Sequence, residues 1–341
     1  MKARIETLGE IVGQPVKQVV IGDLQGFHVA LSSFGASITQ CHAPGAEGYA
    51  DVVLGLETFE DTKARRDYHG ATCGRFANRI RNGRFFLDGQ ECVLGANEGS
   101  TSLHGGPDGF DRRNWSLVGA SDNEATFSLH SPDGDGGYPG ALESSVAYRV
   151  NGDTLSIEIT ASVDQPTMIN LVNHSYWNLD GHDAGSISNH LLQINATRRV
   201  AVDKDLLPTG ELPDVEGSAF DFRTPKPIGH DIPTPEEGGY DLCFCVDETR
   251  GRLHPMATAI SQSSGRKLDI WSTEIGLQFY TAEHFDCTGI GKGGVKYGHR
   301  GAIALETQAW PDTPNQPGFP SARLDPGQTY SHITELRFSR L

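Results

Sequence analysis

The chain has 341 residues, of which 28 are basic and 44 acidic, and its formal net charge is −16 at pH 7. This charge argues against nucleic acid and anionic membrane surfaces as partners, because both repel an acidic protein. No stretch approaches the roughly 20 apolar residues of a membrane span, and the N-terminus lacks a secretory signal, so we expect a cytoplasmic protein with a neutral or cationic small-molecule ligand.

The first third of the chain reads as short strands with one helical interruption. Residues 27–43, "FHVALSSFGASITQCHA", form β-like runs, and short helical turns are possible near residues 57–65. In "RFFLDGQECVL", Asp88 and Gly89 separate two apolar runs, which is typical of a hairpin turn.

A second hairpin is predicted over residues 146–163. Apolar side chains alternate with polar ones in "DTLSIEITASV", the period of a half-buried strand. Asn151 and Gly152 stand where the tight turn is needed.

The remaining segments add strands and two long loops. A hairpin around Ser264 and Gly265 is predicted in residues 260–272, and a closing strand in 332–341. Loops fall at 131–140 and 208–241, the second with anchors of an ordered loop at Phe220, Phe222, Ile228 and Tyr240. Long helices are excluded by 41 glycines and 18 prolines. We therefore expect an all-β fold with few short helices, in one large sandwich or barrel-like domain over residues 1–341.

Six scattered cysteines, at positions 41, 73, 92, 243, 245 and 287, do not resemble a disulfide framework, so reduced thiols are expected. Cys243 and Cys245 would share one face of a strand. Zinc sites usually need four ligands in CxxC pairs, so we interpret these two as buried hydrophobic residues.

Two histidines lie in segments that could carry chemistry. His174, in "LVNHSYWNLDGH", follows a predicted strand, and on its own it is best interpreted as a hydrogen-bonded structural residue. His104, before two glycines in "STSLHGGPDGFDRRNW", is equally consistent with ligand binding and with stabilising a turn.

Glu306 lies near the end of a predicted strand in "GAIALETQAWPDTPN", on the same face as Ala304 and Gln308. A carboxylate withdrawn from water has a raised pKa and becomes a better general base. The local pattern alone favours a solvated glutamate on an outer face.

Asn78 and Arg79 lie in the arginine-rich "GRFANRIRNGRF". Phosphate or nucleic-acid contact is weakened by the acidic chain and by the lack of interleaved aromatics, and recognition of hydroxyl groups remains open. The chain has no GxSxG, Walker A, HExxH or dinucleotide-binding pattern, so no cofactor is implied.

Taken together, "GRFANRI", "SLHGGPDGFDRRNW", "DGGYPG", "NHSYWNL", "GYD", "GLQFYT" and "LETQAWPDTPNQPGFP" resemble the aldose 1-epimerases, the galactose mutarotase family, over about residues 20–340. The resemblance implies a large β-sandwich of the galactose mutarotase type (supersandwich). It also implies interconversion of the α and β anomers of a free aldose such as galactose or glucose, with no cofactor and no metal.

The resemblance assigns roles to individual residues. It implies that His174 is the general acid and Glu306 the general base, and that His104 assists protonation near the ring oxygen. The sugar-binding positions correspond to Asn78, Arg79, His104, Asp241 and Gln278. Trp177 could offer an apolar face to the sugar, but a core aromatic is the favoured interpretation.

Two positions depart from the family pattern. Leu242 follows the sugar-binding aspartate, where family members commonly have histidine, and the segment before the arginine motif carries a polar His69. These changes leave the preferred aldose open. We expect a monomer or weak homodimer.

Three different functions compete with this interpretation. A hexose-6-phosphate 1-epimerase would need cationic groups near C6 of the sugar, for which Arg65, Arg66, Arg112 and Arg113 are candidates. A noncatalytic sugar-binding or sensor protein would not need both His174 and Glu306. A glycoside hydrolase would pair two carboxylates, Asp241 and Glu306, but it gives a histidine acid no comparable place.

Overall fold

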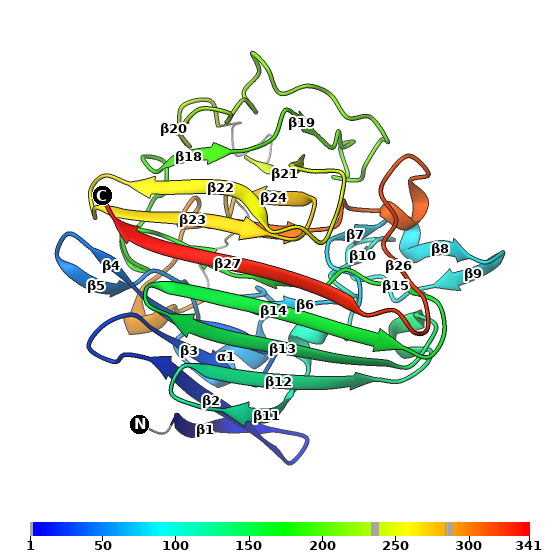
Figure 1. The fold of residues 1–341 in the computed structure, drawn as a ribbon, viewed down its shortest axis with the longest axis horizontal. Coiled ribbons are helices and arrows are strands. Elements are labelled where there is room, and N and C mark those ends of the chain that lie inside the picture. Colours follow the sequence, from blue (N-terminus) through cyan, green and yellow to red (C-terminus); the bar gives the residue numbers. More distant parts are fainter. Residues whose placement is uncertain (1–2, 233–238, 284, 286–288) are drawn as a thin grey trace.

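The computed structural model describes residues 3–232, 239–283, 285 and 289–341 of the chain. Its three large sheets are built from antiparallel strand pairs. Figure 1 shows the strands of the nine-stranded sheet running side by side across the molecule, with the first strands of the chain, in blue, below them. The predicted all-β class with few short helices is confirmed.

The bounds of the strands follow in their spatial order. The N-terminal sheet contains β1 (Arg4–Ile11), β2 (Gln14–Gly22), β3 (His28–Ser32), β4 (Ser37–Gly45) and β5 (Gly48–Asp51). The nine-stranded sheet contains β11 (Ser116–Ala120), β12 (Glu124–Ser131), β13 (Leu142–Asn151), β14 (Thr154–Val163), β27 (Tyr330–Arg340), β23 (Arg266–Ser272), β22 (His254–Ser261), β18 (Leu191–Ile194) and β20 (Lys226–Pro227). The third sheet contains β17 (Tyr176–Trp177), β25 (Ile303–Gln308), β24 (Gly276–Tyr280), β21 (Asp241–Cys245) and β19 (Arg198–Arg199).

Four short pairs complete the strands of the described residues. They are β6 (Ala71–Cys73) with β16 (Val172–His174), β7 (Arg79–Ile80) with β10 (Ser102–Leu103), β8 (Arg84–Leu87) with β9 (Gln90–Val93), and β15 (Thr167–Met168) with β26 (Arg323–Leu324). Single 3₁₀ turns cover Arg81–Gly83, Phe110–Arg112, Asp135–Gly137, Lys292–Gly294 and Thr313–Asn315.

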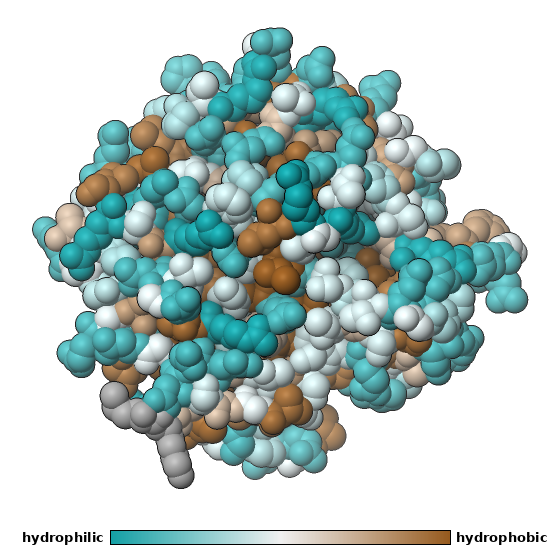
Figure 2. Space-filling model, in the orientation of Figure 1, coloured by the Kyte–Doolittle hydropathy of each residue, from teal (hydrophilic) through white to brown (hydrophobic). Residues whose placement is uncertain are grey.

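The main hydrophobic core joins all three large sheets. In β14 the predicted alternation holds, because Leu155, Ile157 and Ile159 are buried while the residues between them are partly exposed. The same core cluster takes residues from Val19 to Phe338. Figure 2 shows the side of the molecule seen in Figure 1, where hydrophilic side chains predominate and hydrophobic ones form only small patches, as expected of antiparallel sheets with one face in water.

The predicted hairpins are confirmed, with one shift of register. Asp88 and Gly89 both have positive φ, 51° and 80°, and connect β8 to β9, as a type I′ turn requires. The β13–β14 turn lies at Gly152 and Asp153, since Asn151 pairs with Thr154. The predicted position at Asn151 and Gly152 is therefore wrong by one residue, because Gly152, with φ of 58°, takes the first turn position rather than the second.

The predicted helical turn is helix α1 (Phe59–Ala64). Thr58 caps its N-terminus by accepting a hydrogen bond from the backbone N–H of Asp61, which satisfies one free donor of the first turn. In the long loop Phe222 and Ile228 are buried, as predicted for its anchors; its residues 233–238 lie outside the described part of the chain.

The five cysteines in the described part of the chain are free thiols. Cys243 and Cys245 are buried in the same side cluster, which confirms their interpretation as small hydrophobic residues. Cys287 lies outside the described residues. Within the ranges that the structure describes, no helix is long and apolar enough to cross a membrane.

Candidate active site

Glu306 lies near the end of β25, inside the third sheet. Ile303 and Leu305 pack into the main core, whereas Ala304 packs into a different cluster, so the predicted alternation along the strand is confirmed. The Glu306 side chain is only 2% exposed. This burial excludes the solvated glutamate that the local pattern favours.

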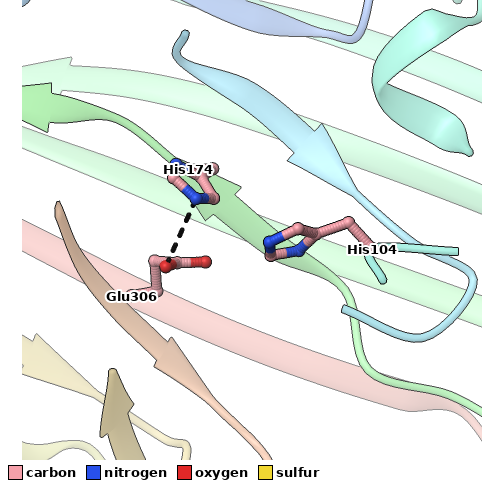
Figure 3. Close-up of side chains that lie close together, drawn as sticks. All are labelled: His104, His174 and Glu306. Carbon is pink, nitrogen blue, oxygen red and sulfur yellow. Dashed lines mark ion pairs between the residues drawn. The ribbon is translucent and has the colours of Figure 1, made fainter. Parts of the chain in front are cut away.

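His174 ends β16, where it pairs with Ala71 of β6. Its side chain is also buried, and its Nε2 lies 3.5 Å from Oε1 of Glu306. Figure 3 shows His174 and Glu306 reaching toward each other from separate strands, with His104 beside them. The structure thus brings together two groups that can each give or take a proton.

Burial controls the protonation of both groups. It lowers the pKa of His174 to about 4, because a charged imidazolium loses its hydration in the interior. It also raises the pKa of Glu306 well above its usual range; the charge of Asp241 adds to this rise and that of Arg79 opposes it. Both shifts act in the same direction, because they favour an uncharged pair with the proton on the carboxyl group rather than on the imidazole.

His104 follows β10 and adopts a left-handed backbone, with φ of 50°. Its Nδ1 accepts a hydrogen bond of 3.1 Å from the backbone N–H of Asn78, so in the neutral ring the hydrogen is on Nε2. Burial, with His174 and nearby arginines, lowers the pKa of His104 well below its usual value. His104 is thus a neutral donor beside His174, whose ring centre is 5.1 Å away.

A glycine is required directly after His104. Gly105 has φ of 85°, and a Cβ there would lie 1.8 Å from the carbonyl oxygen of Gly74. The glycine of "LHGG" that follows His104 therefore helps to orient this histidine, because the chain packs tightly against the start of the arginine-rich motif at this point.

Potential ligand atoms of His104, His174 and Glu306 lie within 4.8 Å of one another, which is close enough to surround a metal ion. A ligating histidine usually donates its other ring N–H to an acceptor, but the other nitrogen of His104 accepts from Asn78. The Nε2 hydrogen then occupies the position that a metal would need. The donor set fits hydrogen bonding to oxygen atoms better than it fits a metal ion.

A wall of polar side chains completes the site. Arg79 on β7 contacts the carboxylates of Glu98 and Asp241. Asp241 also accepts a 2.5 Å hydrogen bond from Nε2 of Gln278, and Gln278 is the cross-strand partner of Glu306. Donors and acceptors therefore alternate along this wall, which suits a ligand rich in hydroxyl groups.

These side chains surround a single cleft of about 220 Å³. All seven residues proposed from the sequence line it, namely Asn78, Arg79, His104, His174, Asp241, Gln278 and Glu306. Eight further residues complete the lining: Arg66, Asp67, Tyr68, Glu98, Leu103, Tyr176, Tyr280 and Phe285.

Sequence reasoning named only Arg66 among these eight, as a candidate phosphate contact, and missed the other seven, although some left a signal. Tyr176 is two residues after His174, so alternation could have placed it on the same side. Tyr68 lies in a segment that is irregular in sequence, yet its ring packs 4.6 Å from His104 and 5.6 Å from His174. Its contact with both histidines depends on tertiary packing and has no local signature.

The two departures from the family pattern do not line the cleft. Leu242 faces the main core beside the cleft residue Asp241. His69 lies behind Tyr176, at 5.1 Å between ring centres, and burial lowers its pKa to about 3. Trp177 is a buried core aromatic, as predicted.

Comparisons with known proteins identify the family of this chain. The sequence model of the aldose 1-epimerase family matches residues 17–337. The galactose mutarotase of Bos taurus is 41% identical over 312 residues, which are 91% of each chain. The aldose 1-epimerase of Escherichia coli K12 is 35% identical over 334 residues, which are 96% of each.

Solved structures give the same answer for the fold. The crystal structure of an aldose epimerase homologue from C. elegans superimposes with a TM-score of 0.87 at 31% identity, covering 95% of this chain and 99% of that one. The galactose 1-epimerase of Lactobacillus acidophilus gives a TM-score of 0.86 at 26% identity, with coverage of 100% and 99%. The predicted sandwich of the galactose mutarotase type is confirmed.

Fold and relatives define the class of this protein as an isomerase that interconverts the α and β anomers of aldoses. The chain belongs to the aldose 1-epimerase family.

Proposed function

We propose that this isomerase acts on an unphosphorylated aldose such as galactose or glucose, with His174 as general acid and Glu306 as general base. The observation that carries the assignment is the 3.5 Å approach of their side chains inside a polar cleft. The mammalian relatives are named galactose mutarotases, which supports galactose as one substrate.

Ring opening uses the single proton of the pair. In the ionised form, His174 gives its proton to the ring oxygen while Glu306 takes the proton of the C1 hydroxyl. The C1–O5 bond breaks and the sugar becomes an open-chain aldehyde. The enzyme is then left with a neutral imidazole and a neutral carboxylic acid, which is the state that burial favours.

Ring closure reverses these transfers. After rotation about the C1–C2 bond, the O5 hydroxyl attacks the other face of the carbonyl. Glu306 returns its proton to O1 and His174 takes the proton from O5, which restores the ionised pair. The charge of the pair is the same in both states, so the cycle needs only proton transfers between groups of suitable pKa.

The remaining cleft residues are proposed to bind the sugar. Asn78, Arg79, Asp241 and Gln278 would hold the ring hydroxyls through the alternating donors and acceptors of the polar wall. The Nε2–H of His104 would donate to an oxygen near the ring oxygen and assist its protonation. Substrate binding replaces water around the pair, which strengthens its electrostatic interactions.

Charge pairing argues against a phosphorylated sugar. Arg66 is held by both oxygens of Asp111, and Arg79 by both oxygens of Glu98. Arg65 and Arg113 are paired with Asp67 and Asp135. A phosphate would have to displace these carboxylates and also approach Asp241, so the neutral sugar is the better fit.

A sugar receptor and a glycoside hydrolase are less well supported. A noncatalytic receptor has no need of a buried acid–base pair, which costs stability. In a hydrolase Asp241 would need to act on the substrate bond, but its oxygens face Gln278 and Arg79.

Polarimetry tests the proposal. Freshly dissolved α-galactose, α-glucose and α-glucose 6-phosphate are followed with the enzyme, with Glu306→Gln and without protein. We expect the wild-type enzyme alone to accelerate the decay of rotation of the free sugars. Acceleration confined to the 6-phosphate would refute the substrate class, and full activity of Glu306→Gln would refute the assigned base.

Three further expectations belong to the proposal. The chain forms one domain, supported by a core cluster shared by all three large sheets. It is a monomer or weak homodimer located in the cytoplasm. Light scattering of the purified protein would test the oligomeric state.

A further inference from the structure

Glu98 forms a two-bond ion pair with Arg79, the Glu98 grip, at the edge of the cleft. Oε2 and Oε1 of Glu98 accept hydrogen bonds of 2.7 Å from Nε and 2.9 Å from Nη2 of Arg79. The Arg79 side chain is 10% exposed and that of Glu98 39% exposed. This is the parallel two-bond arrangement in which arginine and carboxylate bind most strongly.

The backbone presents Glu98 in a fixed position. A tight turn closes between Glu98 and Thr101, whose backbone groups bond in both directions at 3.1 and 2.9 Å. The Asn97 side chain then bonds both backbone groups of Leu103, at 2.8 and 3.0 Å. Leu103 pairs with Arg79 across β10 and β7, so both partners of the grip are held by one small unit of backbone.

This grip fixes the direction of the rest of the guanidinium group. With Nε and Nη2 occupied, Nη1 is directed to Asp241, 3.6 Å from its Oδ2. The other Asp241 oxygen accepts from Gln278, whose own Oε1 is buried without a partner among the described residues. Four side chains thus form a relay from the edge of the cleft to the neighbour of Glu306.

We propose that Glu98 is a positioning residue for the reaction: it holds Arg79 so that Nη1 stays 3.6 Å from Asp241, and the remaining donor of Nη1 and the remaining lone pairs of Asp241 are presented to the sugar. This inference rests on the proposed function of the cleft. Ordinary surface ion pairs contribute little because two flexible side chains must be ordered. Here the turn and the strand pair order both partners before the sugar arrives, which preserves binding free energy.

Loss of Glu98 would redirect Arg79. Asp241, already 3.6 Å from Nη1, is then the carboxylate left to pair with the guanidinium. An Arg79 that closes on Asp241 occupies acceptors meant for hydroxyl groups. Because the substitution removes neither His174 nor Glu306, we expect sugar affinity to fall much more than the rate of the bound complex.

The experiment compares Glu98→Ala and Glu98→Gln with Glu91→Gln. Glu91 makes a single 3.2 Å contact with Arg84 on the β8–β9 hairpin, and neither residue lines the cleft. We expect KM for the aldose to rise about tenfold in Glu98→Ala, with kcat within about twofold. Glu98→Gln keeps one acceptor and should be intermediate, and Glu91→Gln should match the wild type.

A double-mutant cycle separates positioning from direct contact with the sugar. If Glu98 acts through Arg79, its removal has no further effect on KM in an Arg79→Gln background. An equal rise in both backgrounds would show that Glu98 contacts the sugar itself, which would overturn the proposal. An unchanged KM in Glu98→Ala, or a fall of kcat as large as the rise of KM, would overturn it as well.

A readout without sugar keeps the two proposals distinguishable. In the wild type, the Nε–H of Arg79 should give a protected NMR signal that exchanges slowly with water, and Glu98→Ala should lose it while Glu91→Gln retains it. If wild-type protein accelerates no anomerisation but shows this protection, the proposed function fails and the grip stands. If Glu98→Ala keeps the protection, the grip is wrong whatever the activity.

Discussion

Proton counting at the buried pair predicts how the stability of the protein depends on pH. Between about pH 4.5 and 6.5, the usual pKa values of glutamate and histidine, the unfolded chain carries one proton on this pair, on His174. The folded pair also carries one, whether on Glu306 or on the imidazole. The contribution of this pair to the free energy of unfolding is therefore independent of pH in that range.

Outside that pH range the folded and unfolded states bind different numbers of protons at this pair. Above about pH 6.5 the unfolded pair loses its proton while the folded pair keeps it, because the pKa of Glu306 is raised, so stability falls as pH rises. The slope is at most about 1.4 kcal/mol per pH unit, or about 2 kcal/mol between pH 6.5 and 8. Below about pH 4.5 the unfolded pair gains a second proton and stability falls again, since the pKa of His174 is lowered.

The substitution Glu306→Gln removes the fall in stability above about pH 6.5 and replaces the flat range below it with a rise. With no carboxyl group to protonate, the contribution of His174 rises with pH from about 4 to 6.5 and is then constant. The free energy of unfolding of the variant, relative to wild type, should thus increase from about pH 6.5 to 8, by at most about 2 kcal/mol. Turnover should fall by about 10²- to 10⁴-fold, the usual contribution of a general base.

Urea unfolding of both proteins at half-unit steps of pH measures this difference, and polarimetry of the same samples gives kcat. Subtracting the two curves cancels the titration of all groups common to both proteins. A difference that stays constant above about pH 6.5 would refute the raised pKa of Glu306. A variant that keeps more than about a tenth of the wild-type kcat would refute its role as the base.

Three further substitutions test the site and the fold. His174→Asn should lower kcat by about a hundredfold or more while KM changes little, measured by polarimetry. Tyr68→Leu should lower kcat by about tenfold or more, because the ring packs against both His104 and His174; wild-type kcat would contradict this. Lys292→Met leaves Asp51, whose side chain is 11% exposed, without its ion pair and should cost about 3 kcal/mol in urea unfolding.

Much of the fold could be predicted because its signals are local. Alternation in β14 and the Asp88–Gly89 turn depend on neighbouring residues only, and both predictions are confirmed. The predicted turn at Asn151 and Gly152 is wrong by one residue because a glycine can occupy either turn position. The pairing of β14 with β13 and β27 decides between the two positions. The residues of the turn alone do not determine that pairing.

The site is predictable only through the family resemblance. Glu306 and His174 are far apart in the sequence, and the local pattern around each favours a structural interpretation. Their approach depends on the contact of β16 with β25 and on the register that sets Gln278 beside Glu306. Glu98 gives no signal in the sequence, because its partner is fixed by the pairing of β7 with β10.

Because side chains alternate along a strand, the proposed catalytic and binding residues lie on the opposite face from Leu242, one of the two departures from the family pattern. On β25 the face opposite Glu306 is fixed by Thr307, which bonds His332 and Thr334 in the interior. On β21 Asp241 faces the cleft while Leu242 packs in the core. A change at Leu242 therefore alters packing rather than hydroxyl recognition. We therefore expect preference among aldoses to depend on the cleft residues themselves, above all on the proposed holding of Arg79 by Glu98 beside Asp241.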